Sequence, residues 1–372
     1  MKAPHKISAN KFQLDALDGL RGLAVLFVFL SHTSNTGVYL IPGLNFSGIG
    51  TYGVFLFFIL SSFLLTYPFL VKRGDVLTKQ YFSNYFLRRF LRIYPLYMFY
   101  LIMALATTLI FSTVLNTSKP TGIPLPLTFD EFLLQLSLQQ GKSITWSILV
   151  EFRYYFLLPI VAIVYSILLK NKLLPSALFT ILLIVTAQYL WPYDENTNKA
   201  SLGKYLPVFF TGSFLSVLHF NWEKIKQKSR KAEILFEIIG VISFIFIILL
   251  TPSILPLLTQ KEVPISLLHS QFILFSILWG TILFASINGA GILKKIFENK
   301  FLRYIGFISF SFYLWHLVGI RIIKQIDDIL PPFLLGYAML IITILMSHIS
   351  YKKIEVPASR IKFNPRKESN KN

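Results

Sequence analysis

The amino-acid sequence predicts an all-α membrane protein, a polytopic bundle of about ten transmembrane helices with both termini in the cytoplasm. Hydrophobic residues make up 54% of the 372 residues and charged residues only 14%, whereas soluble domains carry charge at about a quarter of their positions. Apolar runs of about 20 residues, the length that crosses a bilayer, recur along the chain. Lysine and arginine gather in alternate connections between these runs. A chain this poor in charge must present much of its surface to lipid.

Ten apolar segments are expected to cross the bilayer. They cover residues 17–35, 52–71, 94–115, 147–169, 175–191, 205–221, 234–251, 267–288, 304–323 and 333–351. Residues 128–140 space Phe129, Phe132 and Leu136 at helical intervals between acidic and amide side chains. This pattern predicts a helix lying along the membrane interface, which does not add a crossing.

The distribution of basic residues predicts the orientation. With alternate connections assigned to the cytoplasm, most lysines and arginines fall on that side, including those of residues 88–92, 224–231 and 294–303. The net charge of +19 therefore follows from topology, and we expect the lipid bilayer and no nucleic acid as a partner. The chain has no cysteine, which excludes disulfides, thiolate metal sites and a cysteine nucleophile.

The chain is expected to form one membrane-embedded domain over residues 1–355. A polar cytoplasmic tail, residues 356–372, is predicted to be disordered. The first apolar run follows three lysines but carries Arg21 and His32 and lacks a small-residue cleavage site. It is therefore interpreted as a retained first helix and not as a signal peptide.

Titratable side chains inside a membrane are costly, so each is a candidate functional residue. Arg21 and His32 lie eleven residues apart on the first span, about 16 Å along a helix axis. Glu151 is expected one to two turns below the outer surface in the fourth span. His316 is expected about 18 Å from the cytoplasmic start of the ninth. These comparable depths, in the outer half of the membrane, permit a pocket that His32, Glu151 and His316 share.

Each of these residues could instead have a structural role. Either histidine could hydrogen-bond to a neighbouring helix, and Glu151 could pair with Arg153 or lie at the interface. His348, near the cytoplasmic end of the last span, is interpreted as structural. No metal site is expected, because the histidines are not paired with carboxylates at the spacing of metal ligands on a helix.

A cluster of arginines precedes the third span in the segment YFLRRFLRIYPLY. The preference of cytoplasmic loops for basic residues would by itself explain Arg88, Arg89 and Arg92. Arg89 and Arg92, however, are three residues apart and share one helical face, where two guanidinium groups can hold a phosphate. Together with Arg21 at the same membrane level, they suit a phosphorylated ligand that arrives from the cytoplasm.

Two of these segments resemble motifs of the acyltransferase-3 family, whose integral membrane members modify bacterial surface polysaccharides, lipopolysaccharide, peptidoglycan and some macrolides. The opening LDGLRG contains Arg21, and His32 follows at the spacing of the family's Arg-x10-His pattern. Arg89 and Arg92 are similar to its Arg-x-x-Arg motif and are followed by IYPLY.

Two later segments extend the resemblance, so that it covers residues 15–318 in the family's order. WSILVEFRYYFLLP resembles WSL-x-x-E-x-x-FYLLLP, with Glu151 at the acid, and SFSFYLWHL resembles S-Y-x-x-YL-x-H, with His316 at its end. Arg153 and Tyr154 depart from the pattern, and no family role is given to Arg153. Fused members carry an SGNH-type hydrolase domain after the last helix. None is seen here, so transfer is expected to be completed by the membrane domain or by a separate partner.

The resemblance implies a membrane O-acyltransferase of the bacterial cell (inner) membrane. The implied donor is a cytoplasmic acyl-CoA, in the simplest case acetyl-CoA. The implied acceptor is a hydroxyl of a cell-envelope polysaccharide, lipopolysaccharide O-antigen or related glycan, which can be lipid-linked.

The resemblance also implies roles for the matched residues. Arg21, Arg89 and Arg92 would bind the CoA phosphates, while the pantetheine arm carries the thioester toward His32. His32 would act as general base on the sugar hydroxyl or accept the acyl group itself. Glu151 would orient or charge-balance His32. His316 is the third catalytic candidate, with its role left open.

Two other function classes remain open. A transporter or flippase for a lipid-linked envelope sugar also contains charged residues within many helices. Discontinuous helices or paired repeats would indicate that class, and neither is evident in the sequence. A membrane sensor or assembly partner without turnover would not need the clustered titratable residues.

Overall fold

The computed structural model describes residues 15–114, 122–193, 200–225, 227, 229–325 and 331–361. Every regular element within these ranges is a helix. The α-helices are α1 (Asp15–Ser34), α2 (Gly50–Lys72), α3 (Lys79–Val114), α4 (Phe129–Leu136), α5 (Thr145–Ile163), α6 (Leu173–Leu190), α7 (Leu206–Trp222), α8 (Arg230–Leu249), α9 (Leu255–Thr259), α10 (Ile265–His269), α11 (Phe272–Asn288), α12 (Ile292–Phe297), α13 (Lys300–Phe307), α14 (Ser309–Lys324), α15 (Pro332–Ser350) and α16 (Val356–Ser359). Short helical turns are η1 (Arg73–Leu77), η2 (Val164–Leu168), η3 (Gly203–Tyr205) and η4 (Tyr351–Glu355).

Eight of the ten predicted spans each overlap one long helix, and the eighth and ninth each overlap two, α10 with α11 and α13 with α14. The all-helical membrane fold is confirmed. By length and composition, seven helices in the described ranges could cross a membrane, or eight if the bent pair α13–α14 is one span. The helices α7 and α11, at 17 residues each, are shorter. The number ten and the cytoplasmic position of the termini therefore stay predictions.

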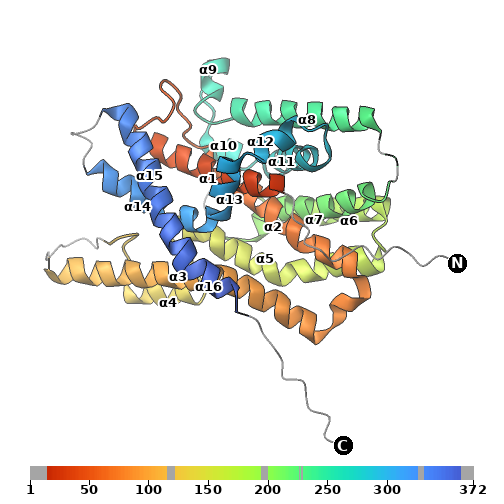
Figure 1. The fold of residues 1–372 in the computed structure, drawn as a ribbon, viewed down its shortest axis with the longest axis horizontal. Coiled ribbons are helices and arrows are strands. Elements are labelled where there is room, and N and C mark those ends of the chain that lie inside the picture. Colours follow the sequence, from red (N-terminus) through yellow and green to blue (C-terminus); the bar gives the residue numbers. More distant parts are fainter. Residues whose placement is uncertain are drawn as a thin grey trace, which may run out of the picture.

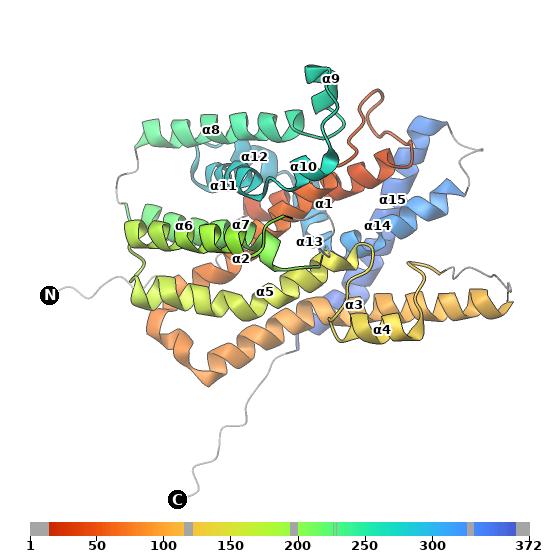
Figure 2. The same cartoon turned by 180° about the vertical axis from the view of Figure 1, so that it is seen from behind.

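The long helices form a bundle in which α1 and α2 are central. Helices α5, α6, α7 and α8 run roughly along the long axis of the molecule (Figures 1 and 2), and α11 packs between α7 and α8. In α1 and α2, 67% of the most apolar 18-residue stretch is buried inside the molecule, whereas in α6 and α8 only 17% and 22% of that stretch is buried. The exposed apolar side chains of α6 and α8 are the surface expected to face lipid.

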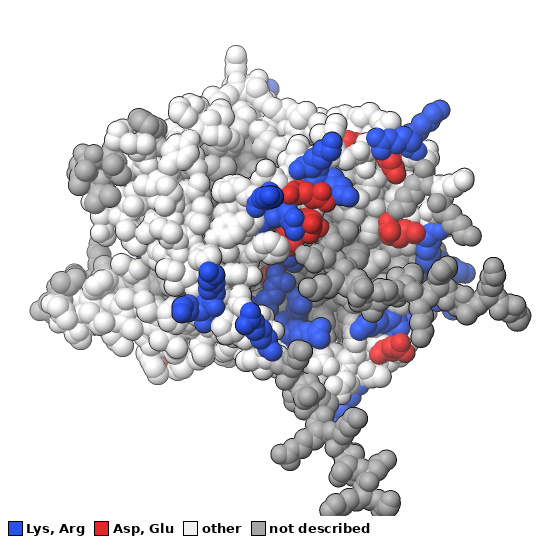
Figure 3. Space-filling view, viewed as in Figure 1, with Lys and Arg blue, Asp and Glu red and all other residues white. Residues whose placement is uncertain are grey.

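The charged residues are unevenly distributed over the surface. Lysine, arginine, aspartate and glutamate gather over the centre and right of the face in Figure 3, whereas its left side is almost uncharged. This separation of charge agrees with a bundle whose basic connections lie at one end.

Glycines bring α13 unusually close to α1. A Cβ atom added at Gly306 of α13 would collide with the carbonyl oxygen of Asp18, and one added at Gly22 of α1 would collide with that of Leu302. Gly19 makes the same kind of contact with the carbonyl oxygen of Phe297, at the end of α12. Only a residue without a side chain fits at such backbone contacts. The glycines of LDGLRG therefore serve helix packing, and this packing fixes the position of Arg21 between them.

Helix α3 begins earlier than predicted. It starts at Lys79 and not at residue 94, and its 36 residues span about 54 Å at 1.5 Å per residue, well beyond the roughly 30 Å hydrocarbon core. The predicted span counted only the apolar part, because the basic segment before Pro95 lowers the hydropathy. That segment is nevertheless helical and carries the arginine cluster.

The amphipathic segment at 128–140 forms the predicted helix, α4, over Phe129–Leu136, and its position at the membrane interface stays a prediction. Helix α4 runs alongside α3 in both views (Figures 1 and 2). Two tyrosines of α3 donate hydrogen bonds to its carbonyl groups: Tyr94 to Leu136 at 2.8 Å and Tyr97 to Gln135 at 3.0 Å. These hydrogen bonds satisfy carbonyl groups at the C-terminal end of α4 and hold the helix against α3.

The ninth predicted span is broken. Helices α13 and α14 meet at an angle of 84°, with Ile308 between them. A discontinuous helix was not evident in the sequence, because the apolar pattern runs through the break without proline. The turn sets the direction of α14, which carries His316.

The boundary between the last helix and the C-terminal tail also differs from the prediction. The last long helix continues through η4 into α16 and ends at Ser359, so the first residues of the predicted tail are helical. Residues 362–372 of that tail, like residues 1–14, lie outside the described ranges.

Replacing Gly306 with alanine is expected to lower the free energy of unfolding by about 1–3 kcal/mol, because the added methyl meets backbone that cannot move aside. Gly74→Ala is the matched control, since nothing lies within 4 Å of a Cβ atom there. Thermal unfolding of both variants in detergent measures the difference. Equal midpoints would contradict the tight contact between α1 and α13.

Candidate active site

The first of two cavities is lined by the predicted arginines, and we call it the arginine cavity. Helices α1, α2, α3, α5 and α14 form its wall, and its volume is about 290 Å³. Its charged residues are Asp18, Arg21, Arg89, Arg92 and Glu151. Three guanidinium groups against two carboxylates leave the cavity positively charged.

The three arginines are brought together from two helices. Arg21 on α1 makes an ion pair with Asp18, one turn before it, at 3.2 Å. Arg89 and Arg92 lie on one face of α3 and make no ion pair with any residue in the described ranges. Arg88 is exposed and is not part of the cavity. The predicted grouping of Arg21, Arg89 and Arg92 is therefore reproduced.

The docking of α3 on α5 places this face of α3 against the cavity. Tyr85, one turn before Arg89, donates a hydrogen bond to the carbonyl oxygen of Tyr155 at 3.1 Å. The hydroxyl of Tyr155 donates in turn to Glu151 Oε1 at 2.7 Å. The carboxylate is thereby held by α5 itself, within the arginine cavity.

The expectation that Glu151 shares a pocket with His32 is wrong in this structure. Glu151 lines the arginine cavity, and His32 lines the second cavity. The prediction assumes that α5 starts at the outer surface, but its start lies inside the bundle, where Thr145 is fully buried. Arg153 donates hydrogen bonds to the carbonyl oxygens of Ala200 and Gln139 and is not paired with Glu151.

The second cavity contains His32, and we call it the histidine cavity. Its volume is about 790 Å³, within the range of about 300–1,000 Å³ of ligand pockets. Its polar and aromatic lining residues are Ser31, His32, Asn35, Thr51, Ser143, Trp146, Tyr193, Lys204, Tyr205, Ser266, His269, Phe272 and Tyr313. Aromatic faces beside hydroxyl and amide groups suit a polar ligand with flat apolar faces.

The ring of His316 packs against the ring of His32. The two ring centroids are 5.0 Å apart, as the predicted grouping of the histidines requires. His316 is fully buried and lines neither cavity. Its Nδ1 lies 2.6 Å from the carbonyl oxygen of Tyr313. Because a carbonyl only accepts, Nδ1 carries the proton and Nε2 is a lone-pair acceptor. Nε2 has no hydrogen-bond partner among the described residues.

A third histidine of this region was not singled out in the sequence. His269, at the end of α10, donates from Nε2 to the carbonyl oxygen of Gly48 at 2.9 Å, and Nδ1 faces the hydroxyl of Thr51 at 3.3 Å. These contacts hold the ring against the wall of the histidine cavity. His348, predicted to be structural, bonds to the hydroxyl of Tyr304 at 2.8 Å and lies in neither cavity.

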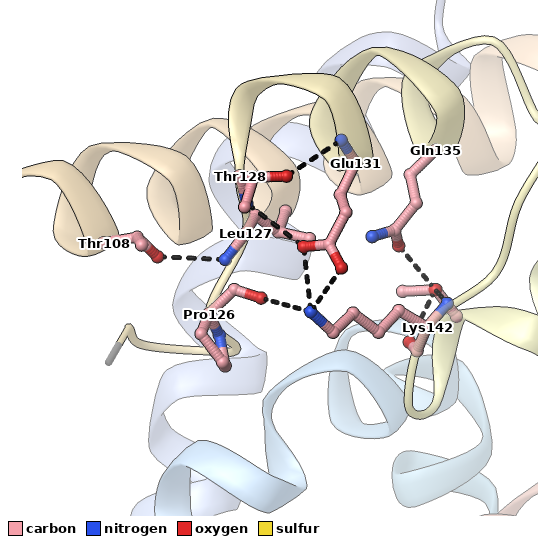
Figure 4. Close-up of polar contacts among 8 residues, drawn as sticks. Thr108, Pro126, Leu127, Thr128, Glu131, Gln135 and Lys142 are labelled. Atoms are coloured by element: carbon pink, nitrogen blue, oxygen red, sulfur yellow. Dashed lines mark hydrogen bonds and ion pairs between the residues drawn. The ribbon is translucent and has the colours of Figure 1, made fainter. Parts of the chain in front are cut away.

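A polar network around α4 fixes the loop that enters the histidine cavity (Figure 4). Thr128 and Glu131 form a capping box at the start of α4. Glu131 also accepts hydrogen bonds from Lys142 Nζ at 2.7 and 2.8 Å. The hydroxyl of Thr145 at the start of α5 donates to Gln135 Oε1 at 2.7 Å. The loop between α4 and α5, which supplies Ser143 to the cavity, is thus anchored at both ends.

Within the part of the chain that the structure describes, no group of three or more His, Asp or Glu side chains is arranged to hold a metal ion.

Comparison with known proteins identifies the family. The acyltransferase-3 family model, described as an acyltransferase domain, matches residues 14–352. The chain belongs to the acyltransferase-3 family. It is 26% identical over 372 residues to the peptidoglycan O-acetyltransferase OatA of Listeria monocytogenes, covering 94% of this chain and 56% of that protein.

A second relative is the O-acetyltransferase OatA of Staphylococcus aureus, which is 23% identical over 377 residues, covering 96% of this chain and 60% of that protein. The chain thus spans a little over half the length of the curated relatives it matches. No solved structure matches it.

The family motifs therefore lie around two adjoining cavities of a multi-pass membrane protein. Three lining residues were missed in the sequence: Asp18, Tyr313 and His269. Asp18 and Tyr313 stand inside the segments LDGLRG and SFSFYLWHL, so a closer analysis of those segments could have found them. His269 stands alone in a polar connection, and only the fold brings it to the cavity.

The ion pair in Figure 4 predicts a dependence of stability on pH. Burial alone would raise the pKa of Glu131, but hydrogen bonds from Lys142 and Thr128 and the charge of Lys142 outweigh burial and lower it. The carboxylate therefore stabilises the fold above its unfolded pKa of about 4.3, and this contribution is lost as the pH falls through the lower folded pKa.

Glu131→Gln is expected to lower the unfolding temperature slightly at pH 7, because both side chains of the pair are partly exposed. The difference from the wild type should shrink as the pH falls below about 4. Unfolding scans from pH 7 to pH 3 measure it. A difference that is constant over this range would show that the pair does not stabilise the loop.

Proposed function

We propose that the chain is a membrane O-acetyltransferase that moves an acetyl group from acetyl-CoA to a hydroxyl of a cell-envelope glycan. The observation that carries the proposal is that the two cavities adjoin each other. The arginine cavity has the positive charge to bind phosphate, and the histidine cavity contains His32 beside a space large enough for a sugar ring. Membership of the acyltransferase-3 family and relatives named O-acetyltransferases support the reaction class.

The arginine cavity is the proposed site of the donor. Arg89 and Arg92 have their donors available for phosphate oxygens, since neither is paired with a carboxylate among the described residues. At about 290 Å³ the cavity is smaller than a typical cofactor pocket. It therefore suits the phosphates and the pantetheine arm, with the adenosine outside at the mouth.

The histidine cavity is the proposed site of the acceptor. Trp146 and Tyr205 stack on each other with ring centroids 5.2 Å apart and offer aromatic faces at its wall. A sugar ring combines apolar C–H faces with hydroxyl groups, which Asn35, Thr51 and Ser266 can bind. The relative from Listeria is named a peptidoglycan O-acetyltransferase, so peptidoglycan is the first acceptor to test. Lipopolysaccharide O-antigen and lipid-linked glycans belong to the same chemical class.

The reaction needs one proton transfer and one exchange of bonds. His32 takes the proton of the sugar hydroxyl, and the oxygen attacks the thioester carbonyl. The new C–O bond forms, the C–S bond breaks, and the CoA thiolate takes up a proton. In the alternative mechanism through an acyl-enzyme, His32 first accepts the acetyl group on a ring nitrogen and then passes it to the sugar hydroxyl.

The other two candidates act through their neighbours. His316 lines neither cavity, so its proposed role is to position His32 or to accept its proton at Nε2. Glu151 lies among the arginines, where its carboxylate limits their mutual repulsion and directs them toward the donor. This role replaces the proposed charge balance of His32.

The proposed orientation places the arginine cavity toward the cytoplasm of the bacterial cell (inner) membrane. Cytoplasmic acyl-CoA then reaches the arginines directly, and the histidine cavity opens toward the envelope glycan. The gathering of basic residues at one end of the bundle supports this orientation.

A transporter or flippase for a lipid-linked sugar is the second candidate, and the break between α13 and α14 favours it, since such proteins bind substrates at broken helices. Purified protein given acetyl-CoA and glycan oligosaccharides separates the two. Release of CoA together with an acetylated oligosaccharide supports the enzyme. Movement of a lipid-linked sugar across vesicles without release of CoA supports the transporter.

Replacing His32 with alanine is expected to lower acetyl transfer by about 10²- to 10⁴-fold, because the general base is lost. His348→Ala is the control, since that histidine lies in neither cavity. Mass spectrometry of envelope glycans from cells expressing each variant measures acetylation, and membrane fractionation confirms insertion. Normal acetylation by the His32 variant would exclude its catalytic role.

Arg89→Ala and Arg92→Ala are each expected to weaken acetyl-CoA binding at least about tenfold, because each removes charge-assisted hydrogen bonds to phosphate. Arg88→Ala, the same change at an exposed neighbour, should leave the affinity nearly unchanged. Titration calorimetry in detergent measures all three. An equal effect at the three positions would assign the cluster to membrane topology.

A further inference from the structure

The two cavities meet at a narrow boundary. Among the residues that the structure describes, only Val54 of α2 and Tyr313 of α14 line both of them. Val54 is 5% exposed and Tyr313 is 7% exposed, so both are held within the bundle. Any group that moves from the arginine cavity to His32 by the shortest route must pass between these side chains.

The ring of Tyr313 is held in place by its hydroxyl group. The hydroxyl lies 2.9 Å from the carbonyl oxygen of Ile144 and 2.7 Å from the hydroxyl of Ser147. A phenol has one proton and a carbonyl only accepts, so Tyr313 donates to Ile144 and accepts from Ser147. Both partners belong to the start of α5 and the loop before it, which the α4 network anchors.

The backbone of Tyr313 is fixed as well. Its carbonyl oxygen accepts the hydrogen bond of His316 Nδ1. Its ring packs edge-on against Phe57, with centroids 6.5 Å apart, and Phe57 is part of the arginine cavity. A tyrosine fixed at its backbone, its ring and its hydroxyl forms a rigid wall of defined width.

We infer that Val54 and Tyr313 form the passage of the thioester between the cavities and that its width limits the donor to short acyl groups. This inference rests on the proposed function. The phosphates stay on the arginines while the acyl end of the arm reaches His32, so the acyl group itself must fit between the two side chains. An acetyl group adds one methyl to the carbonyl, whereas a butyryl group adds a chain of three carbons.

The passage can be widened by a mild substitution of Val54, which has a branched side chain. Val54→Ala removes two methyl groups and leaves Tyr313 with its hydrogen bonds. Discrimination of single methylenes in a shaped apolar site amounts to about 10- to 200-fold. The wild type is therefore expected to prefer acetyl-CoA over butyryl-CoA by at least about tenfold in kcat/KM.

The experiment compares the two donors in the full-length protein with Val54→Ala. The ratio of butyryl to acetyl transfer should rise about tenfold or more, and the affinity for free CoA, measured by calorimetry, should stay unchanged. Val217→Ala is the matched control, because Val217 is fully buried and lines neither cavity. The same loss of volume there should not change the ratio.

Tyr313→Phe tests the hydrogen bonds that hold the ring. It keeps the ring and removes both bonds, so butyryl transfer should rise relative to acetyl transfer, with the unfolding temperature recorded alongside. An unchanged ratio in both Val54→Ala and Tyr313→Phe, in a protein that transfers acetyl groups, would overturn the passage and leave the proposed function standing. A wild type that binds acyl-CoA and transfers no acetyl group would overturn the proposed function itself, and the inference with it.

Discussion

Charge inside an apolar helix bundle must face a partner or a cavity, because contact between charge and lipid costs about 3 kcal/mol for each group. In this protein that constraint decides where the functional residues can be. Arg21, Arg89, Arg92 and Glu151 come from three different helices and converge on one cavity. The apolar residues of α6 and α8 face outward instead. The site is therefore a consequence of the same physics that makes the chain a membrane protein.

Close packing at the start of the chain supports this convergence. Gly22 and Gly306 let α1 and α13 touch at the backbone, and an ion pair between Asp15 and Arg303 at 2.8 Å joins the same two helices. Helix α14 turns away at 84° and is tied to α15, where Trp315 Nε1 donates to the hydroxyl of Ser350 at 3.0 Å. The break lets one segment of chain pack on α1 and then pass between the two cavities.

The division into two cavities accounts for the arrangement of the chemistry. In the proposed function, a charged donor and a sugar acceptor make opposite demands: one needs fixed positive charge, and the other needs aromatic faces with hydroxyl groups. The two cavities on either side of Tyr313 offer these two environments separately. The α4 network contributes by holding the loop that carries Ile144, to which Tyr313 is bonded.

The sequence by itself determined the helical membrane fold, the chemical character of the site and its family. Hydropathy located the long helices to within a few residues, except for the start of α3 and the break between α13 and α14, and motif spacing predicted Arg21, His32, Arg89 and Arg92 as site residues. These features are local: the length of an apolar run and the repeat of a helix can be counted along the chain.

Only the tertiary structure decided how these residues are shared between cavities. The depth of Glu151 depends on a loop that enters the bundle, the direction of α14 depends on a bend without proline, and the part played by Tyr313 depends on partners 166 and 169 positions away in the sequence. Contacts over such separations arise from packing between helices, and no local pattern of residues encodes them.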